Sequence, residues 1–201
     1  MPGPLSRCLA ALVFVAAVSA CSRGTPDRAQ APLAGAAIGG PFTLMDSTGK
    51  TVRWSDFDGR YRIVYFGYTY CPDACPLDVQ RIARGFALFK QVQPGLAKQV
   101  QPLFVSIDPA RDTPAKVGEF ARAFSPDIMG LTGTDQQVAD AAKAFKAYYK
   151  KVPASAPDQY VMDHSRTAYL MGRKGEPIAL LPIDVADQGK AVAAELAKWV
   201  S

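Results

Sequence analysis

Two hydrophobic patterns alternate along the chain from about residue 41 onward. Nearly unbroken apolar runs at 61–70 and 101–108 predict strands that are buried on both faces. Each run is followed by a segment in which apolar residues recur every three or four positions, and this spacing predicts helices over 76–92 and 113–125. The rest of the pattern predicts a β-hairpin at 41–54, a short strand at 128–133 and a helix at 134–152. A strand–turn–strand unit at 166–183 and a closing helix at 187–200 complete the prediction.

Residues at the ends of these elements support the assignment. Pro76 fits the first turn of its helix, where the missing N–H costs nothing. Thr113 is a suitable N-cap, and either Thr134 or Asp135 can cap the helix that follows. The alternation of strands and helices indicates a layered α/β domain. The order matches a thioredoxin-like fold with an N-terminal β-hairpin and an inserted strand and helix around 112–150, and peroxiredoxins share much of it.

The first 40 residues follow neither pattern. Arg7 precedes an apolar run at 8–20, which is too short to span a membrane but is typical of a secretory signal peptide. The sequence VSAC, which ends at Cys21, resembles a bacterial lipobox, so we expect residues 1–20 to be removed and Cys21 to carry lipid. The alternatives are a plain signal peptide cut near Ala20, or an uncleaved anchor.

Residues 21–40 are rich in Ala, Gly and Pro, which predicts a flexible tether ahead of a domain that spans 41–201. The protein is therefore expected in the bacterial cell envelope, held to a membrane by its lipid with the domain in the periplasm. The formal net charge of +5 includes no block of basic residues, so the sequence indicates no nucleic-acid function.

Two of the four cysteines remain in the domain, because Cys8 leaves with the signal peptide and Cys21 carries lipid. In an oxidising compartment, Cys71 and Cys75 would form a disulfide unless they are reduced or metallated. Cys71 falls at the end of a predicted central strand and Cys75 at the start of a helix, where free backbone N–H groups favour thiolates. Three residues separate the pair, a spacing that permits either a disulfide or two ligands of one metal ion.

His164 is the only histidine in the chain, in the sequence DHS just before the strand-like run RTAYLM. In a thioredoxin-like order this loop lies against the cysteine loop, so the imidazole is placed to complete a site of two thiolates and one nitrogen. Thiolates select copper(I), and an added imidazole also suits copper(II). The simpler alternative is a solvated histidine with no ligand role.

Three motifs together resemble the Sco/SenC family of copper-binding assembly factors for cytochrome c oxidase. They are FGYTYCPDACP at 66–76, the later VSIDPARDTP and VMDHS. The resemblance implies a thioredoxin-like fold and one copper ion, copper(I) or copper(II), bound by Cys71, Cys75 and His164. It also implies delivery to the binuclear copper centre of oxidase subunit II, with other copper chaperones as further partners.

Two acidic residues are expected near the site. The resemblance places Asp108 and the PARDTP segment there, as supporting or partner-facing residues, and helix capping is the equally simple alternative. Asp163 is next to His164 and is expected either to orient its ring or to be an ordinary exposed turn residue.

Three functions remain open at this stage. The first is copper delivery, which is binding and transfer without turnover. The second is a thiol–disulfide reductase that cycles the Cys71–Cys75 pair and keeps the cysteines of the oxidase copper site reduced. The third is a thiol peroxidase, which is disfavoured because no proline precedes Cys71 in the Pro-x-x-x-Thr-x-x-Cys pattern. The sequence also has DHS where thioredoxins place a proline beside their disulfide, which favours metal binding over thiol exchange.

Overall fold

A computed structural model describes residues 27–154 and 159–201 of the chain. The predicted signal peptide at 1–20 and the predicted lipid site at Cys21 lie outside these residues. Within the described ranges, no helix combines the length and the apolar character needed to cross a bilayer.

A five-stranded mixed sheet forms the centre of the molecule, in the strand order β5-β4-β3-β8-β9. Strands β3, β4 and β5 are parallel, and β8 and β9 run antiparallel to their neighbours. The strands are β3 (Tyr61–Gly67), β4 (Val100–Ser106), β5 (Met129–Leu131), β8 (Ala168–Met171) and β9 (Pro177–Leu181).

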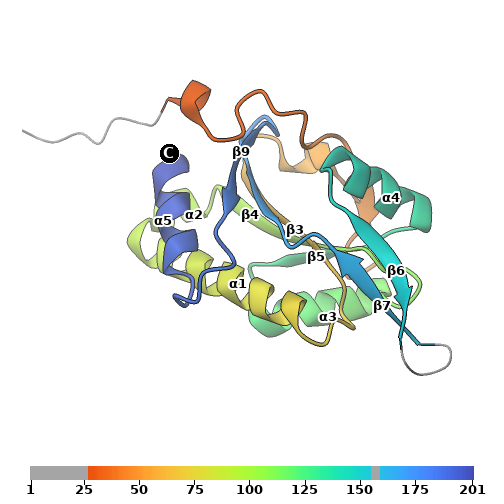
Figure 1. Cartoon of the computed structure of the whole chain (residues 1–201). Coiled ribbons are helices and arrows are strands. Elements are labelled where there is room, and N and C mark those ends of the chain that lie inside the picture. Colours follow the sequence, from red (N-terminus) through yellow and green to blue (C-terminus); the bar gives the residue numbers. More distant parts are fainter. Residues whose placement is uncertain (1–26, 155–158) are drawn as a thin grey trace, which may run out of the picture.

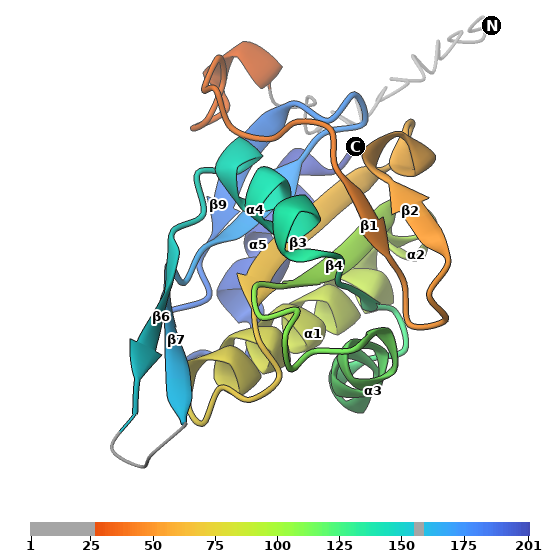
Figure 2. The same cartoon turned by 90° about the vertical axis from the view of Figure 1, so that its right-hand side faces the viewer.

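Helices cover both faces of this sheet (Figures 1 and 2). One face carries α1 (Ala74–Val92), α3 (Pro114–Phe124) and α5 (Lys190–Trp199), and α1 packs against both of the others. The opposite face carries α4 (Asp135–Ala144), which packs against the β-hairpin. The hairpin strands and the short helices are β1 (Thr43–Met45), β2 (Thr51–Arg53), α2 (Pro94–Ala97), η1 (Arg28–Gln30) and η2 (Trp54–Phe57). This arrangement is the predicted thioredoxin-like fold.

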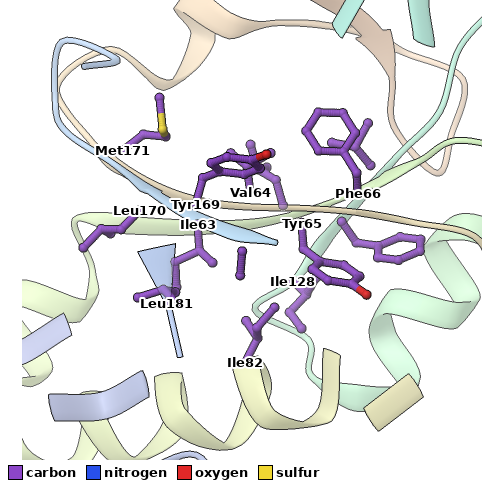
Figure 3. Close-up of a cluster of buried hydrophobic side chains, with 14 of the residues drawn as sticks. Ile63, Val64, Tyr65, Phe66, Ile82, Ile128, Tyr169, Leu170, Met171 and Leu181 are labelled. Carbon is purple, nitrogen blue, oxygen red and sulfur yellow. The ribbon is translucent and has the colours of Figure 1, made fainter. Parts of the chain in front are cut away.

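The hydrophobic core lies on both sides of β3, all seven residues of which are buried. Val64 and Phe66 point to the α4 side, whereas Ile63 and Tyr65 point toward α1, where Ile82 meets them (Figure 3). This two-sided burial explains why the sequence there shows an apolar run with no alternation.

The helix caps form as predicted. The Thr113 hydroxyl accepts a hydrogen bond from the Lys116 backbone N–H at the start of α3. Thr134, rather than Asp135, caps α4, and Gln137 completes a reciprocal capping box with it.

The predicted helix over 134–152 is wrong in its second half. The structure ends α4 at Ala144 and forms strand β6 (Tyr149–Pro153), which pairs antiparallel with β7 (Tyr160–His164). The helix stops because Phe145 is buried in the core and Lys146 adopts a positive φ of 55°. The segment before RTAYLM, which we expected to be a loop, is therefore strand β7. We refer to β6 and β7 as the ribbon.

Residues 28–40 pack on the domain, which differs from the flexible tether expected for 21–40. Ala31 is only 7% exposed, and the backbone N–H of Leu33 donates to the Ile178 carbonyl at 3.0 Å. Gly39 donates to the Ala144 carbonyl at 2.9 Å with φ at +90°, and a Cβ there would lie 2.5 Å from the Met171 methyl. The described domain therefore begins before Pro41.

Candidate metal centre

Cys71, Cys75 and His164 come together from three separate elements. Cys71 lies in the turn after β3, Cys75 is the second residue of α1, and His164 is the last residue of β7. The start of α1 lies beside the end of β7 (Figure 2). Strand β3 ends at Gly67, so Cys71 lies four residues beyond the strand rather than at its end.

The donor atoms of these three residues all lie within 4.8 Å of one another. The Cys75 Sγ and His164 Nε2 atoms are 3.2 Å apart. Metal–sulfur and metal–nitrogen bonds of about 2.0–2.3 Å separate two donors on one ion by at most ~4.6 Å. The three side chains can therefore take up one ion with movements of a few tenths of an ångström. Among the residues that the structure describes, no further histidine, cysteine or carboxylate side chain joins these three.

The cysteine loop is shaped by close contacts on both sides. A Cβ on Gly67 would lie 2.9 Å from the Tyr65 ring and 3.1 Å from the Cys75 sulfur, so only glycine fits there. At the far side, Asp112 is 1% exposed and accepts hydrogen bonds from the Thr69 backbone N–H at 3.0 Å and from its hydroxyl at 2.6 Å. Asp112 belongs to the DPARDTP motif, and its structural role there was not predicted.

The imidazole of His164 has a defined orientation. Its Nδ1 lies 3.0 Å from the Ser165 carbonyl oxygen, which can only accept a hydrogen bond. The ring proton therefore sits on Nδ1, and the lone pair of Nε2 faces the Cys75 sulfur. The rings of Tyr65 and Tyr68 contact the imidazole edge-on, with centroids 6.4 Å and 5.9 Å away.

Of the two alternatives for Asp163, the structure favours the exposed residue, although Asp163 lies in strand β7 rather than in a turn. Alternation along β7 points Asp163 away from His164, and Asp163 instead accepts a long hydrogen bond of 3.4 Å from the Tyr148 hydroxyl. The Ser165 carbonyl orients the imidazole in its place. Carbonyl acceptors of this kind are common behind metal-binding histidines.

Asp108 is buried near the ribbon rather than against the three donor residues. Its carboxylate accepts hydrogen bonds from Arg111 Nε at 2.5 Å and from the Tyr160 hydroxyl at 2.8 Å. Arg111 also donates to the Tyr160 carbonyl at 2.9 Å and lies over the Tyr160 ring. Asp108 thereby links the loop after β4 to β7, the strand that carries His164.

The two thiols are in different electrostatic environments. Cys71 is half-buried, and the hydrogen bond with the Cys75 side chain lowers its pKa, with a further hydrogen bond from the Cys75 backbone N–H at 3.3 Å. The same side-chain hydrogen bond and complete burial raise the pKa of Cys75. These opposite shifts favour the thiolate at Cys71 and the thiol at Cys75, so a metal that binds both sulfurs must displace the Cys75 proton.

Asp78 is a buried carboxylate that the sequence analysis did not single out. It is 0% exposed and accepts hydrogen bonds from the Tyr65 hydroxyl and from two nitrogens of Arg166. One sequence signal for it exists, because Asp78 occupies the apolar stripe of α1 between Cys75 and Ile82. An acidic residue in such a stripe requires a buried partner.

The fold and the site define a thioredoxin-like protein with a dithiol–imidazole group beyond the carboxyl end of its central strand β3. The sequence matches the family model described as SCO1/SenC over residues 30–201. The chain belongs to the SCO1/SenC family.

Two relatives support this assignment. Protein SenC of Rhodobacter capsulatus is 44% identical over 156 residues, which cover 78% of this chain and 66% of that protein. The mitochondrial SCO1 homolog of Homo sapiens is 36% identical over 139 residues, which cover 69% of this chain and 46% of the human protein. The match thus spans less than two thirds of the length of either relative.

A solved structure shows the same fold. Bradyrhizobium japonicum ScoI with copper bound superposes with a TM-score of 0.71 at 36% identity, covering 81% of this chain and 99% of that one.

Proposed function

We propose that this protein binds one copper ion through Cys71, Cys75 and His164, and delivers it to the binuclear copper centre of cytochrome c oxidase subunit II. The observation that carries the proposal is the convergence of the three donor atoms within 4.8 Å. Family membership and the similarity to a ScoI structure with copper bound support the choice of metal.

The chemistry of the donors fits copper that is handed on. Two thiolates favour copper(I), and the Nε2 lone pair of His164 adds a ligand that also suits copper(II). Cys75 is buried, whereas Cys71 and His164 are partly exposed, so a partner can approach the ion from their side. Exchange of a soft ion between thiolates then needs no oxidation or reduction of the protein.

Copper stoichiometry tests this function directly. Reduced, tag-free protein is expected to hold one copper per chain by metal analysis after desalting. Cys71→Ser, Cys75→Ser and His164→Ala each remove a ligand and should hold little. The matched control is Asp163→Asn, which changes the neighbour of His164 on the opposite face of β7 and should still hold one copper.

Delivery is tested by mixing the copper-loaded protein with the metal-free copper domain of oxidase subunit II and analysing the separated proteins. Copper found in the oxidase domain supports the proposal. If this protein retained its copper under reducing conditions that keep the thiols of both proteins free, that result would contradict delivery.

A second function is favoured by the geometry and acidity of the cysteine pair. The Cys71 and Cys75 sulfurs lie within 4.8 Å, and Cys71 has a lowered pKa, as in thiol–disulfide exchangers. In that case the protein reduces a disulfide in the oxidase copper site and itself becomes the Cys71–Cys75 disulfide, with the electrons resupplied by an external thiol. Full reductase activity in His164→Ala, together with no copper in the wild type, would establish this alternative and overturn copper delivery.

We further propose that the chain is a lipid-anchored protein of the bacterial envelope with its domain in the periplasm, where other copper chaperones supply it. The proposal rests on the apolar run at 8–20 and on the lipobox-like VSAC that ends at Cys21. Intact mass of protein from membranes is expected to show a chain that starts at Cys21 with added acyl mass. An unmodified N-terminus would contradict the anchor.

A further inference from the structure

A bidentate ion pair joins the two segments that carry Cys75 and His164. Asp78 lies one helical turn after Cys75 in α1, and Arg166 lies two residues after His164. Arg166 donates to the Asp78 carboxylate from Nε at 2.8 Å and from a terminal nitrogen at 2.6 Å. Each partner is therefore within three residues of one proposed copper ligand.

The Asp78 carboxylate is fully buried and held from two sides. Besides Arg166, the Tyr65 hydroxyl donates to it at 2.9 Å, and Tyr65 belongs to the central strand β3. Arg81 approaches no closer than 3.6 Å, so Arg166 supplies the close cationic partner among the described residues. A buried carboxylate that accepts two hydrogen bonds from one planar guanidinium forms a bidentate pair. Such a pair restricts both the distance and the angle between the two segments that carry the partners, here α1 and the residues after β7.

Such a restraint matters because the ribbon is a separate two-stranded sheet. In the described residues, β6 and β7 pair only with each other, and neither belongs to the five-stranded sheet. The chain rejoins that sheet at Ala168, which pairs with Tyr65. The position of His164 relative to α1 therefore depends on side-chain contacts.

We propose that the Asp78–Arg166 pair is a positioning device that holds His164 Nε2 against the Cys75 sulfur and so preforms the metal centre. This inference rests on the proposed copper function for its consequence, but the positioning itself is a property of the metal-free protein. Without the pair, the end of β7 is free to move away from α1, and copper binding must order it again at a cost in affinity.

The first experiment reads the position of His164 without metal. His164 is the only histidine, so tag-free, metal-free, reduced protein gives one set of imidazole NMR signals. The rings of Tyr65 and Tyr68 shift these signals from free-imidazole values. At about pH 9, where an ordinary imidazole is neutral, Arg166→Gln should move them most of the way to free values, and Arg166→Lys should move them less.

Two further variants keep the test decisive. Arg166→Gln leaves the Asp78 charge buried without its partner and risks unfolding, so Asp78→Asn combined with Arg166→Gln removes both charges at once. Lys90→Gln is the matched control, because it breaks the Lys90–Asp127 pair at 2.9 Å, remote from the three donors. Its imidazole signals should equal those of the wild type. Wild-type signals in the folded double variant would overturn the proposal.

The second experiment measures the consequence. Copper(I) affinity, by competition with a colorimetric chelator, should fall about 10- to 100-fold in the double variant, as for other residues that support metal-binding histidines. The Cys71–Cys75 disulfide does not involve His164, so its equilibrium with a thiol buffer should stay within about twofold of the wild type.

Each failure has a distinct meaning. Unchanged affinity with shifted imidazole signals would show that the pair positions His164 without serving the metal, which overturns the proposed preforming of the centre. If the equilibrium constant of the Cys71–Cys75 disulfide changed as much as the copper affinity, the pair would act on the whole cysteine loop. That result would also overturn the proposed preforming of the centre. A wild-type protein that binds no copper would contradict the proposed function. The NMR experiment would still test whether the Asp78–Arg166 pair positions His164.

Discussion

Cys71 and Cys75 differ in both exposure and acidity. Cys71 is half-buried with a pKa lowered to about 3 by the Cys75 side-chain hydrogen bond, whereas Cys75 is fully buried with a raised pKa. In reduced, metal-free protein, iodoacetamide should therefore modify Cys71 first. The rate should change little between about pH 6 and pH 9, because the thiolate is already formed throughout that range. Peptide mass spectrometry over a pH series gives both results.

Replacing Cys75 tests the cause of this acidity. Cys75→Ala removes the group that most lowers the pKa of Cys71, so the pKa should rise toward its ordinary value of 9.0. Alkylation at neutral pH should then slow and become steeply pH-dependent. Cys75→Ser retains a hydroxyl donor and should stay closer to the wild type. A flat pH profile in Cys75→Ala would show that another group sets the acidity.

At the residue scale, the sequence predicted which donors meet but not what supports them. The predicted fold alone placed His164 near the cysteine loop, because the segment that enters the antiparallel strand β8 lies beside the end of β3. The orienting acceptor is the Ser165 carbonyl rather than Asp163, and a backbone atom leaves no signal in a sequence. The Asp78–Arg166 pair spans 88 positions, so no local pattern reveals it.

At the element scale, the ribbon is tied to the loop after β4 through Tyr160. The Tyr160 hydroxyl donates to Asp108 at 2.8 Å, and burial together with this hydrogen bond raises the pKa of Tyr160 to about 12. We predict that Tyr160→Phe loosens the ribbon. Amide hydrogen exchange in β7 should quicken several-fold, and copper affinity should fall, but by less than in the Asp78–Arg166 double variant.

Tyr148→Phe is the control for this experiment. Tyr148 precedes β6 and is 53% exposed, and its side chain makes only the long 3.4 Å hydrogen bond to Asp163 among the described residues, so the substitution keeps its backbone bonds to Ser165. Its loss should leave both hydrogen exchange and copper affinity at wild-type values. Equal effects in the two variants would mean that the Asp108 hydrogen bond is not what holds the ribbon.

Elements with a strong pattern and a capping signal were predictable, and the ribbon was not. The buried runs gave β3 and β4, and Thr113 and Thr134 marked the starts of α3 and α4. No Gly or Pro marks the end of α4 in the sequence. Lys146 makes the turn instead, with a positive φ that a non-glycine residue adopts at some cost. The burial of Phe145 compensates for this conformation, and only the tertiary structure shows that burial.

At the scale of the whole molecule, residues 28–40 lie along the end opposite the metal centre (Figure 2). Three hydrogen bonds fasten this segment, of which the shortest runs from Arg28 to the Tyr61 hydroxyl at 2.6 Å. The other two are the backbone bonds of Leu33 and Gly39, to Ile178 and Ala144. Each contributes about 0.5–1.5 kcal/mol to folding, and ordering the segment offsets part of the gain.

We therefore predict that a chain beginning at Pro41 is less stable than one beginning at Asp27, by about 1–3 kcal/mol. Urea unfolding followed by circular dichroism measures the difference. Copper stoichiometry should stay at one per chain in both proteins, because the segment contacts β9 and α4 rather than the three donors. Equal free energies of unfolding would mean that residues 28–40 contribute nothing to the domain and act as the tether that their composition suggests.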